Sequence, residues 1–221
     1  MKKGHVLLAL SLAAMPLVSA QTALDLPSTY LNNNTSGGAN NLPPNVQGSP
    51  YLTDDFIRGT VYSEGEKPYP AMMRYNAYQD EMQVQGSGGI TTLFKRDYVW
   101  AVLGGETFRI ESYETGSGER QGYFVELNPG KARLLKRYRR EFREGEAAVS
   151  SYSQGQPPRF DEETTYFLAL EGSPAKEVKL RKKDVLEVLS NPEAEAFVQE
   201  NKLKLKSEEE VIQLLNFVNS Q

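Results

Sequence analysis

The feature that most constrains the fold is a series of short segments in which apolar and polar residues alternate, separated by glycine-rich turns. The clearest example runs from Met72 to Val84, where two alternating arms flank the polar break Gln79-Asp80-Glu81. A period of two around one polar break predicts a β-hairpin with one buried face. The polar face of this hairpin carries Arg74, Asn76 and Tyr78.

Further runs of the same kind predict more strands. They cover residues 57–62, 90–94, 98–103, 107–113, 122–127, 132–138 and 164–170. The breaks between them contain turn residues, among them Gly104-Gly105 and Asn128-Pro129-Gly130. This close spacing favours an antiparallel meander over strand-helix-strand units. The run at 164–170 is the most apolar, so we expect it in the middle of the sheet.

After residue 174 the apolar period changes to about three and a half, which predicts helices. One helix covers residues 182–190, and Asn191-Pro192 supplies the cap and first turn of a second. Ser207 and Glu210 form a capping box that starts a third. The fold class is therefore α+β: a curved antiparallel β-sheet meander, or a half-barrel if the curvature is strong, followed by two or three short C-terminal helices.

The two ends of the sequence differ in character. Residues 1–20 combine a basic start, an apolar run and small residues before Gln21, which predicts a cleavable signal peptide and a protein exported to the periplasm or cell surface. The apolar run is shorter than the roughly 20 residues that span a bilayer. Residues 21–49 are rich in Asn, Gly, Ser and Pro, which predicts a disordered linker. An antiparallel β domain at 50–180 and a helical segment at 181–221 packed on the sheet follow.

The amino-acid composition excludes several chemistries. There is no cysteine, and the one histidine, His5, lies in the predicted signal peptide. This excludes catalytic triads with histidine and zinc or copper sites built on imidazole or thiolate. We predict no metal, no cofactor and no catalytic residue. Without Lys2 and Lys3 the chain has 23 basic and 29 acidic residues, a net charge of −6, which disfavours nucleic-acid binding.

The densest charge feature is the stretch 131–143, with seven basic residues and one acidic residue. Arginine forks match phosphate and carboxylate geometry, so this stretch predicts a binding strip for anionic headgroups or acidic polysaccharide. The alternative is a charged strand edge that prevents edge-to-edge pairing. Aromatic residues such as Trp100 could line a sugar or lipid site. The candidate ligand-binding residues are Arg74, Asn76, Tyr78, Trp100, Arg133, Arg137 and Arg139.

Three acidic pairs, at 54–55, 80–81 and 162–163, bear on catalysis. Neighbouring residues on a strand point to opposite faces, so no such pair can act as the two carboxylates of a glycosidase. A glycosidase would need two carboxylates from different segments, converging within about 10 Å in an aromatic-lined cleft.

Four segments, taken in order, resemble a family of exported Bacteroidota proteins that has no established activity. They are Ser49–Leu52, Gly59–Tyr62, Arg74–Met82 and the tail from Glu200 to Asn219. The resemblance covers most of the chain from about Ser49. It implies export and a similar fold, and it implies no activity.

The leading functional hypothesis is a non-enzymatic exported protein that binds an amphipathic ligand or a partner protein through its sheet. Candidate partners are a lipid, a glycan or an envelope protein. The alternatives are a carbohydrate-active enzyme with paired carboxylates and a structural protein of envelope assembly.

Overall fold

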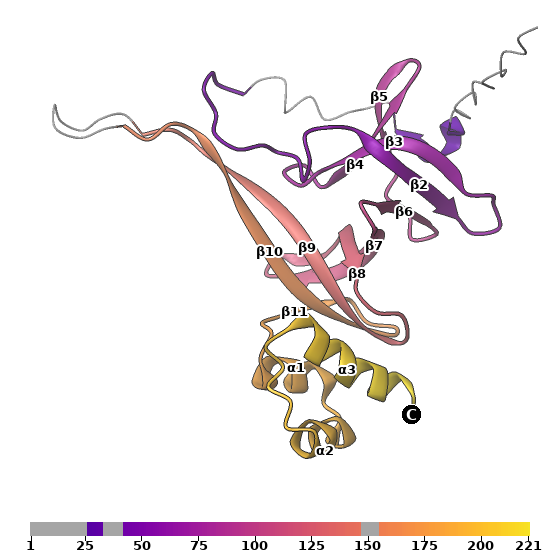
Figure 1. Ribbon diagram of the computed structural model, residues 1–221, viewed down its shortest axis with the longest axis vertical. Coiled ribbons are helices and arrows are strands. Elements are labelled where there is room, and N and C mark those ends of the chain that lie inside the picture. Colours follow the sequence, from indigo (N-terminus) through magenta and orange to yellow (C-terminus); the bar gives the residue numbers. More distant parts are fainter. Residues whose placement is uncertain (1–25, 33–41, 147–154) are drawn as a thin grey trace, which may run out of the picture.

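The computed structural model describes residues 26–32, 42–146 and 155–221. In these residues eleven strands form one open antiparallel sheet, and three helices follow it (Figure 1). The strands lie in the order β1-β5-β4-β3-β2-β6-β7-β8-β9-β10-β11, so from β6 onward each strand pairs with the next along the chain. The predicted α+β class, a curved antiparallel meander with short C-terminal helices, is confirmed.

The elements have the following bounds. The strands are β1 Leu31–Asn32, β2 Ile57–Ser63, β3 Tyr69–Asn76, β4 Glu81–Gly86, β5 Gly89–Leu93, β6 Val99–Leu103, β7 Glu106–Thr115, β8 Gly118–Glu126, β9 Ala132–Arg143, β10 Arg159–Leu170 and β11 Lys176–Val178. The helices are α1 Lys182–Leu189, α2 Pro192–Glu200 and α3 Glu208–Asn219, and a single 3-10 turn covers Ser28–Tyr30.

The predicted hairpin at 72–84 is formed by β3 and β4, with Met73 opposite Val84. The alternation arises because Met73, Tyr75 and Met82 point into a hydrophobic core, the first of the molecule, where they are fully buried. The turn contains Asp80 at a φ of 56°, a left-handed conformation that Asp tolerates better than most residues. The hairpin therefore places a carboxylate at the end of β3 and β4.

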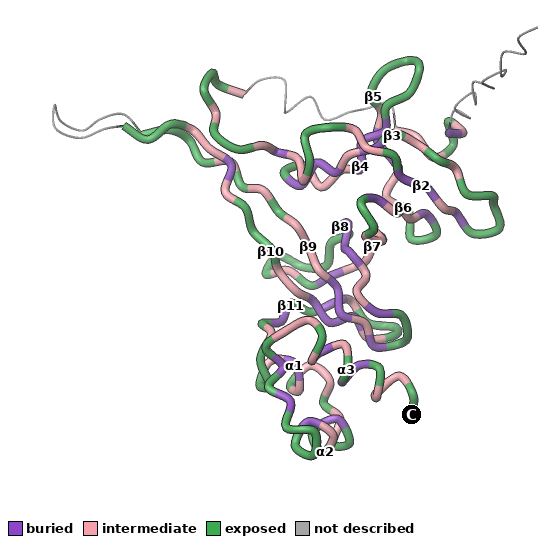
Figure 2. Tube along the Cα trace, viewed as in Figure 1, coloured by how far each residue is buried: buried purple, intermediate pink, exposed green. Residues whose placement is uncertain are grey.

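The sheet curls back on itself at its C-terminal end. Ala175, just before β11, donates its N–H to the carbonyl of Ser112 at 2.8 Å and accepts from the N–H of Glu114 at 3.0 Å, so β11 lies close to β7. The curl encloses a cluster of rings, Tyr113, Phe124 and Phe167, whose centroids are 5.0–5.6 Å apart in edge-to-face contact. Figure 2 shows buried residues gathered here, where β7, β8 and the lower part of β9 meet.

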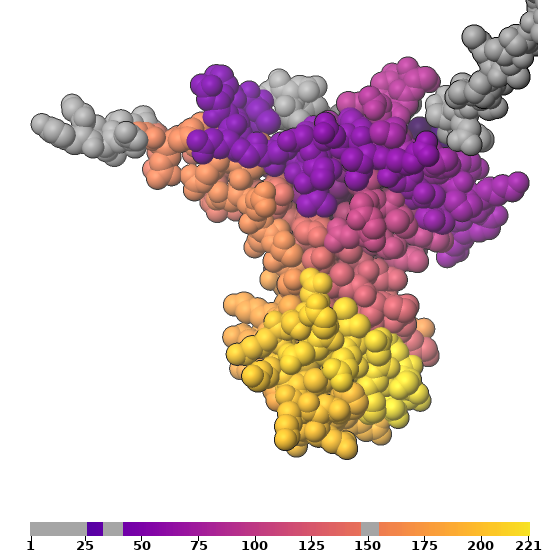
Figure 3. Space-filling model, viewed as in Figure 1, coloured from indigo at the N-terminus to yellow at the C-terminus, as the bar shows by residue number. Residues whose placement is uncertain are grey.

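The helices form the second core on the other face of β9 and β10, and Figure 3 shows them as a body at one end of the molecule. The predicted cap of α2 is confirmed, because the Asn191 side chain accepts from the N–H groups of Glu193 and Ala194. Ser207 caps α3 by accepting from the N–H of Glu210. The Glu210 carboxylate accepts from residues 204 and 206 instead of completing the box at Ser207.

The two ends of α3 are both tied to the sheet. At its start, the Tyr166 hydroxyl donates to Glu208 at 2.8 Å; burial and this contact raise the pKa of Tyr166 to about 12. At its end, the Asn219 side chain accepts from the N–H of Ala132 at 2.8 Å and donates to the carbonyls of Ala132 and Pro129. These bonds fix the helical body on β9 and β10.

Two sequence predictions about position were wrong. The apolar run at 164–170 lies in β10, one strand from the end of the sheet, and not in its middle. It is apolar because both of its faces are covered: Leu168 packs in the helical core, and Phe167 and Ala169 pack in the ring cluster. The linker prediction also fails for its described pieces, since Leu31 pairs with Leu93 and Gln47 pairs with Arg159.

The predicted signal peptide at 1–20 lies outside the described residues. No helix in the described ranges is long and apolar enough to cross a membrane.

Candidate functional site

The candidate site lies where β8 and β9 separate. β8 has nine residues and β9 has twelve, yet they pair only at Val125↔Lys136 and Glu126↔Leu135. Beyond this point the β3–β4 turn sits between the two strands. The N–H of Arg140 in β9 donates to the carbonyl of Ala77, and the N–H of Tyr123 in β8 donates to the Asp80 carboxylate at 3.1 Å. The turn thus accepts hydrogen bonds from β8 and β9 in the region where these two strands do not pair with each other.

Asp80 is the centre of this arrangement. Besides the N–H of Tyr123, its carboxylate accepts from the Tyr75 hydroxyl at 2.7 Å and from the Lys95 ammonium at 2.6 Å. Burial, reinforced by the negative charge of Asp80, raises the pKa of Tyr75 and of Tyr123 well above the ordinary value. Glycine at position 122 suits this packing, because a Cβ there would lie 2.9 Å from an Asp80 oxygen and would force the carboxylate to shift.

A groove of about 420 Å³ opens beside Asp80, between the β3–β4 turn, the tip of the β7–β8 hairpin and the strands β9 to β11. We name it the arginine groove. Its lining includes four arginines and three acidic residues, with rings and hydroxyls between them. The lining residues are Ala77, Tyr78, Asp80, Tyr113, Glu114, Thr115, Gly116, Ser117, Arg120, Arg137, Arg139, Arg140, Thr165, Phe167 and Glu177.

Arg137 is the most unusual residue of the arginine groove. Its side chain is only 11% exposed, and its guanidinium lies over the rings of Tyr113 and Phe124, at 4.4 and 5.5 Å from their centroids. The nearest carboxylate oxygen, on Asp80, is 3.7 Å away, which is too far for a hydrogen bond. Among the described residues its buried Nε has no acceptor. A buried donor without a partner costs about 1–3 kcal/mol, so a further acceptor at this guanidinium would be stabilising.

Of the other arginines of the groove, Arg140 is 8% exposed and pairs with Glu162 at 3.0 Å, whereas Arg139 and Arg120 are only loosely paired. Arg139 lies 3.5 Å from Glu163, with both side chains about half exposed. Arg120 reaches the Ser117 hydroxyl at 3.4 Å. Exposed ion pairs of this kind contribute about 0–1 kcal/mol, so a ligand anion could displace them at little cost.

The structure brings three of the predicted ligand-binding residues together in the arginine groove: Tyr78, Arg137 and Arg139. Tyr78 is 42% exposed at the rim, with its ring against Phe160. Arg137 and Arg139 come from the predicted basic strip. From Arg137 outward, β9 has a strand partner only on the β10 side, so this part of the strip is also a charged edge.

The polar face predicted for the hairpin is occupied by internal contacts. Arg74 lies 3.6 Å from the ring centroid of Tyr51 and donates to the carbonyl of Asp54 at 2.8 Å. Asn76 was expected to face a ligand, but it is fully buried. Its side-chain oxygen accepts from the N–H groups of Tyr78 and Gln79, because the turn leaves those donors without a ladder partner.

Trp100 lies apart from the arginine groove and from a second groove, which contains Arg133. Its ring stacks on Tyr62, the residue directly opposite it in β2, and the Arg109 guanidinium covers it at 4.6 Å. These contacts occupy the ring, which does not line either groove.

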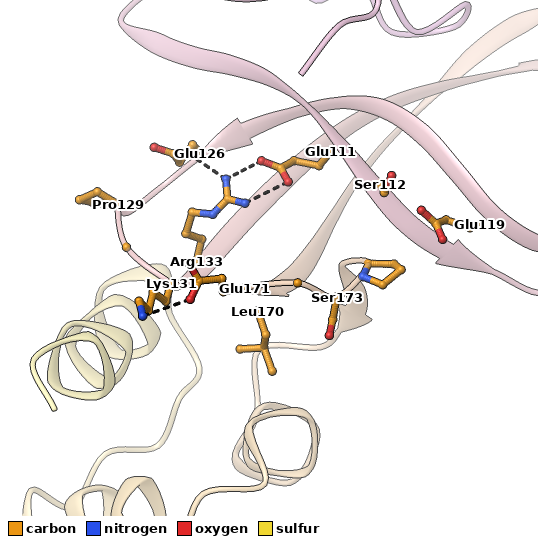
Figure 4. A pocket seen from close by; sticks show the side chains of 13 residues that line it. Glu111, Ser112, Glu119, Glu126, Pro129, Lys131, Arg133, Leu170, Glu171 and Ser173 are labelled. Atoms are coloured by element: carbon orange, nitrogen blue, oxygen red, sulfur yellow. Dashed lines mark hydrogen bonds and ion pairs between the residues drawn. The ribbon is translucent and has the colours of Figure 1, made fainter. Parts of the chain in front are cut away.

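Arg133 lies in a second, larger groove of about 830 Å³, which we name the glutamate groove (Figure 4). Its guanidinium binds both oxygens of Glu111 and also reaches Glu126 at 3.1 Å. Burial alone would lower the pKa of Arg133, but the two carboxylates raise it above the ordinary value. Lys131 and Glu171 pair at 3.2 Å on the rim.

The glutamate groove meets one condition for a glycosidase and fails two. Glu111 and Glu126 share one nitrogen of Arg133, so their bound oxygens lie within about 6 Å of each other. However, no lining residue is aromatic, and each carboxylate is held by a guanidinium instead of the apolar surroundings that keep a general acid protonated. This groove is chiefly an ion-pair network that joins β7, β8 and β9.

Sequence reasoning missed the roles of Asp80 and Arg120. Asp80 had been considered only as one of an acidic pair. Its position in a tight turn is the signal that could have distinguished it, since Asp in a left-handed turn often bonds to neighbouring backbone. Arg120 lies in a polar stretch whose pattern says nothing about its partner strand.

In the part of the chain that the structure describes, no three Asp, Glu, His or Cys residues come together as a metal site. Comparisons with known proteins give no further guide: no family model matches the chain, and neither a curated protein nor a solved structure matches it significantly. The resemblance to exported Bacteroidota proteins stays a prediction.

Proposed function

We propose that this chain is a non-enzymatic, exported binding protein that takes an anionic ligand in the arginine groove of its curved sheet. The observation that carries the proposal is Arg137, whose guanidinium is nearly buried and stacked on two rings, has no acceptor for its Nε among the described residues, and has its nearest carboxylate oxygen, on Asp80, 3.7 Å away. A carboxylate or phosphate in the groove would give this guanidinium a closer acceptor than Asp80, in the bidentate geometry that arginine prefers.

The surroundings of Arg137 support an anionic group attached to a small apolar or sugar-like body. Arg120 and Arg139 add positive charge, and the exposed ring of Tyr78 offers a flat apolar rim. A volume of about 420 Å³ is within the usual range of ligand sites. Both grooves are lined by charged residues, which suits an anionic headgroup or a glycan carboxylate better than an acyl chain.

The test is isothermal titration of the mature chain with inorganic phosphate, glucuronate and a soluble short-chain phosphatidic acid. Binding of at least one of these is expected, and Arg137→Met should abolish it. Arg143→Met is the matched control, because Arg143 lies on the same strand but outside the groove and is 53% exposed. Equal weakening by both substitutions would show a general charge effect and contradict the proposal.

A carbohydrate-active enzyme is the second candidate, since Glu111 and Glu126 do converge. It predicts hydrolysis of aryl glycosides or polysaccharide that is lost in Glu111→Gln. The ion pairs of both carboxylates with Arg133 make this the less favoured function.

A further inference from the structure

The arginine groove is bordered by a strand edge that no other strand covers. β8 pairs with β7 from Gly118 to Val125, which is all but its last residue. On its other edge it pairs with β9 only at Val125 and Glu126, and the N–H of Tyr123 is taken by Asp80. From Gly118 to Gly122 the described residues provide no strand on this edge, and residues 118–121 are exposed. A free edge of this kind is a template for strand addition.

Arginines outnumber acidic residues beside the free edge, four to three, and Glu119 on the edge itself points to the face opposite Arg120. Arg120 is directly opposite Tyr113, so its side chain starts from the same face of the sheet as the ring that supports Arg137. Arg137 and Arg139 are two residues apart on β9, so they share a face about 7 Å apart. An added strand with acidic residues at alternate positions would present carboxylates on this face with the same spacing.

We infer that the anionic ligand of the arginine groove is an extended acidic segment of a partner protein, which adds as a strand to the edge of β8 at residues 118–122. This inference rests on the proposed function and specifies its ligand. Main-chain hydrogen bonds to β8 would supply affinity, while Arg120, Arg137 and Arg139 would select carboxylates. A glycan has carboxylates too, but it cannot continue a main-chain ladder.

The test uses the mature chain and a nine-residue peptide that alternates threonine and glutamate, with binding measured by fluorescence anisotropy. Two further peptides carry backbone N-methyl groups on one or the other alternate set of residues. Strand addition uses only one edge of the peptide, so one methylated peptide should bind at least about tenfold more weakly and the other should bind like the parent. The same peptide with glutamine for glutamate should lose binding, as should Arg137→Met, while Arg143→Met should not change it.

Any of three results would overturn the inference and leave the proposed function standing. If both methylated peptides bind like the parent, or if oligoglucuronate binds more tightly than the peptide, the groove recognises charge alone; the proposed function then stands and the strand-addition inference falls. If the peptides do not bind while phosphate or glucuronate does, the strand-addition inference also falls and the proposed function stands. If neither peptide nor any small anion binds, the proposed function itself fails.

Discussion

Asp80 provides the sharpest prediction about what holds the sheet and its groove together. Its carboxylate accepts hydrogen bonds from two buried donors, the Tyr75 hydroxyl and the N–H of Tyr123. Tyr75 is 1% exposed and Tyr123 is 3% exposed. Asp80→Ala leaves both donors without a partner, at about 1–3 kcal/mol each. It also places alanine at a φ of 56°, which costs about a further 1 kcal/mol. The expected loss in the free energy of unfolding is about 3–7 kcal/mol.

Asp80→Asn is the matched control, because asparagine keeps one oxygen and tolerates the left-handed backbone. It mainly loses the ion pair with Lys95, which is 34% exposed and therefore screened, so we expect a loss of about 1 kcal/mol. Urea unfolding at pH 7, followed by circular dichroism, measures both variants. If Asp80→Ala costs no more than Asp80→Asn, the buried donors are not what Asp80 stabilises, and the reasoning is refuted.

Three further predictions concern stability. Because the pKa of Tyr75 is raised in the folded state, the unfolded chain releases that proton first, near pH 10. The contribution of Tyr75 to stability should therefore be constant near neutral pH and fall above about pH 10, so that urea unfolding across alkaline pH shows a less steep loss in Tyr75→Phe. Gly122→Ala puts a Cβ against Asp80 and should cost about 1–3 kcal/mol, whereas Gly88→Ala, with nothing within 4 Å, should change the unfolding midpoint little. Asn219→Ala should cost about 1–3 kcal/mol and speed amide hydrogen exchange in α3; unchanged exchange would show that the helix end is held by other contacts.

The strands and helices could be predicted from the sequence because each buries one face. The alternation at 72–84 follows from the burial of Met73, Tyr75 and Met82, and the cap at Asn191 follows from local backbone chemistry. The position of β10 could not be predicted in this way. Its apolar run reflects cover on both faces, which a strand near the sheet end obtains here from helices on one side and the ring cluster on the other.

The candidate site was only partly predictable for a related reason. Composition pointed to the basic strip, and therefore to Arg137 and Arg139. The separation of β8 from β9 depends on the turn at Asp80, which is more than 40 residues away from Tyr123 in sequence, and no local pattern reveals such a contact. Asn76 shows the converse, since a polar residue on a predicted outer face can be buried when its side chain completes a turn.

The central claim is that Arg137 binds an anionic ligand. The most direct test is its side-chain Nε–H signal in a ¹H–¹⁵N spectrum of the protein. The account predicts that the Arg137 signal shifts and saturates as phosphate or glucuronate is added, while the signal of Arg143 does not. A signal that is insensitive to every anion, or that moves in parallel with that of Arg143, would contradict it.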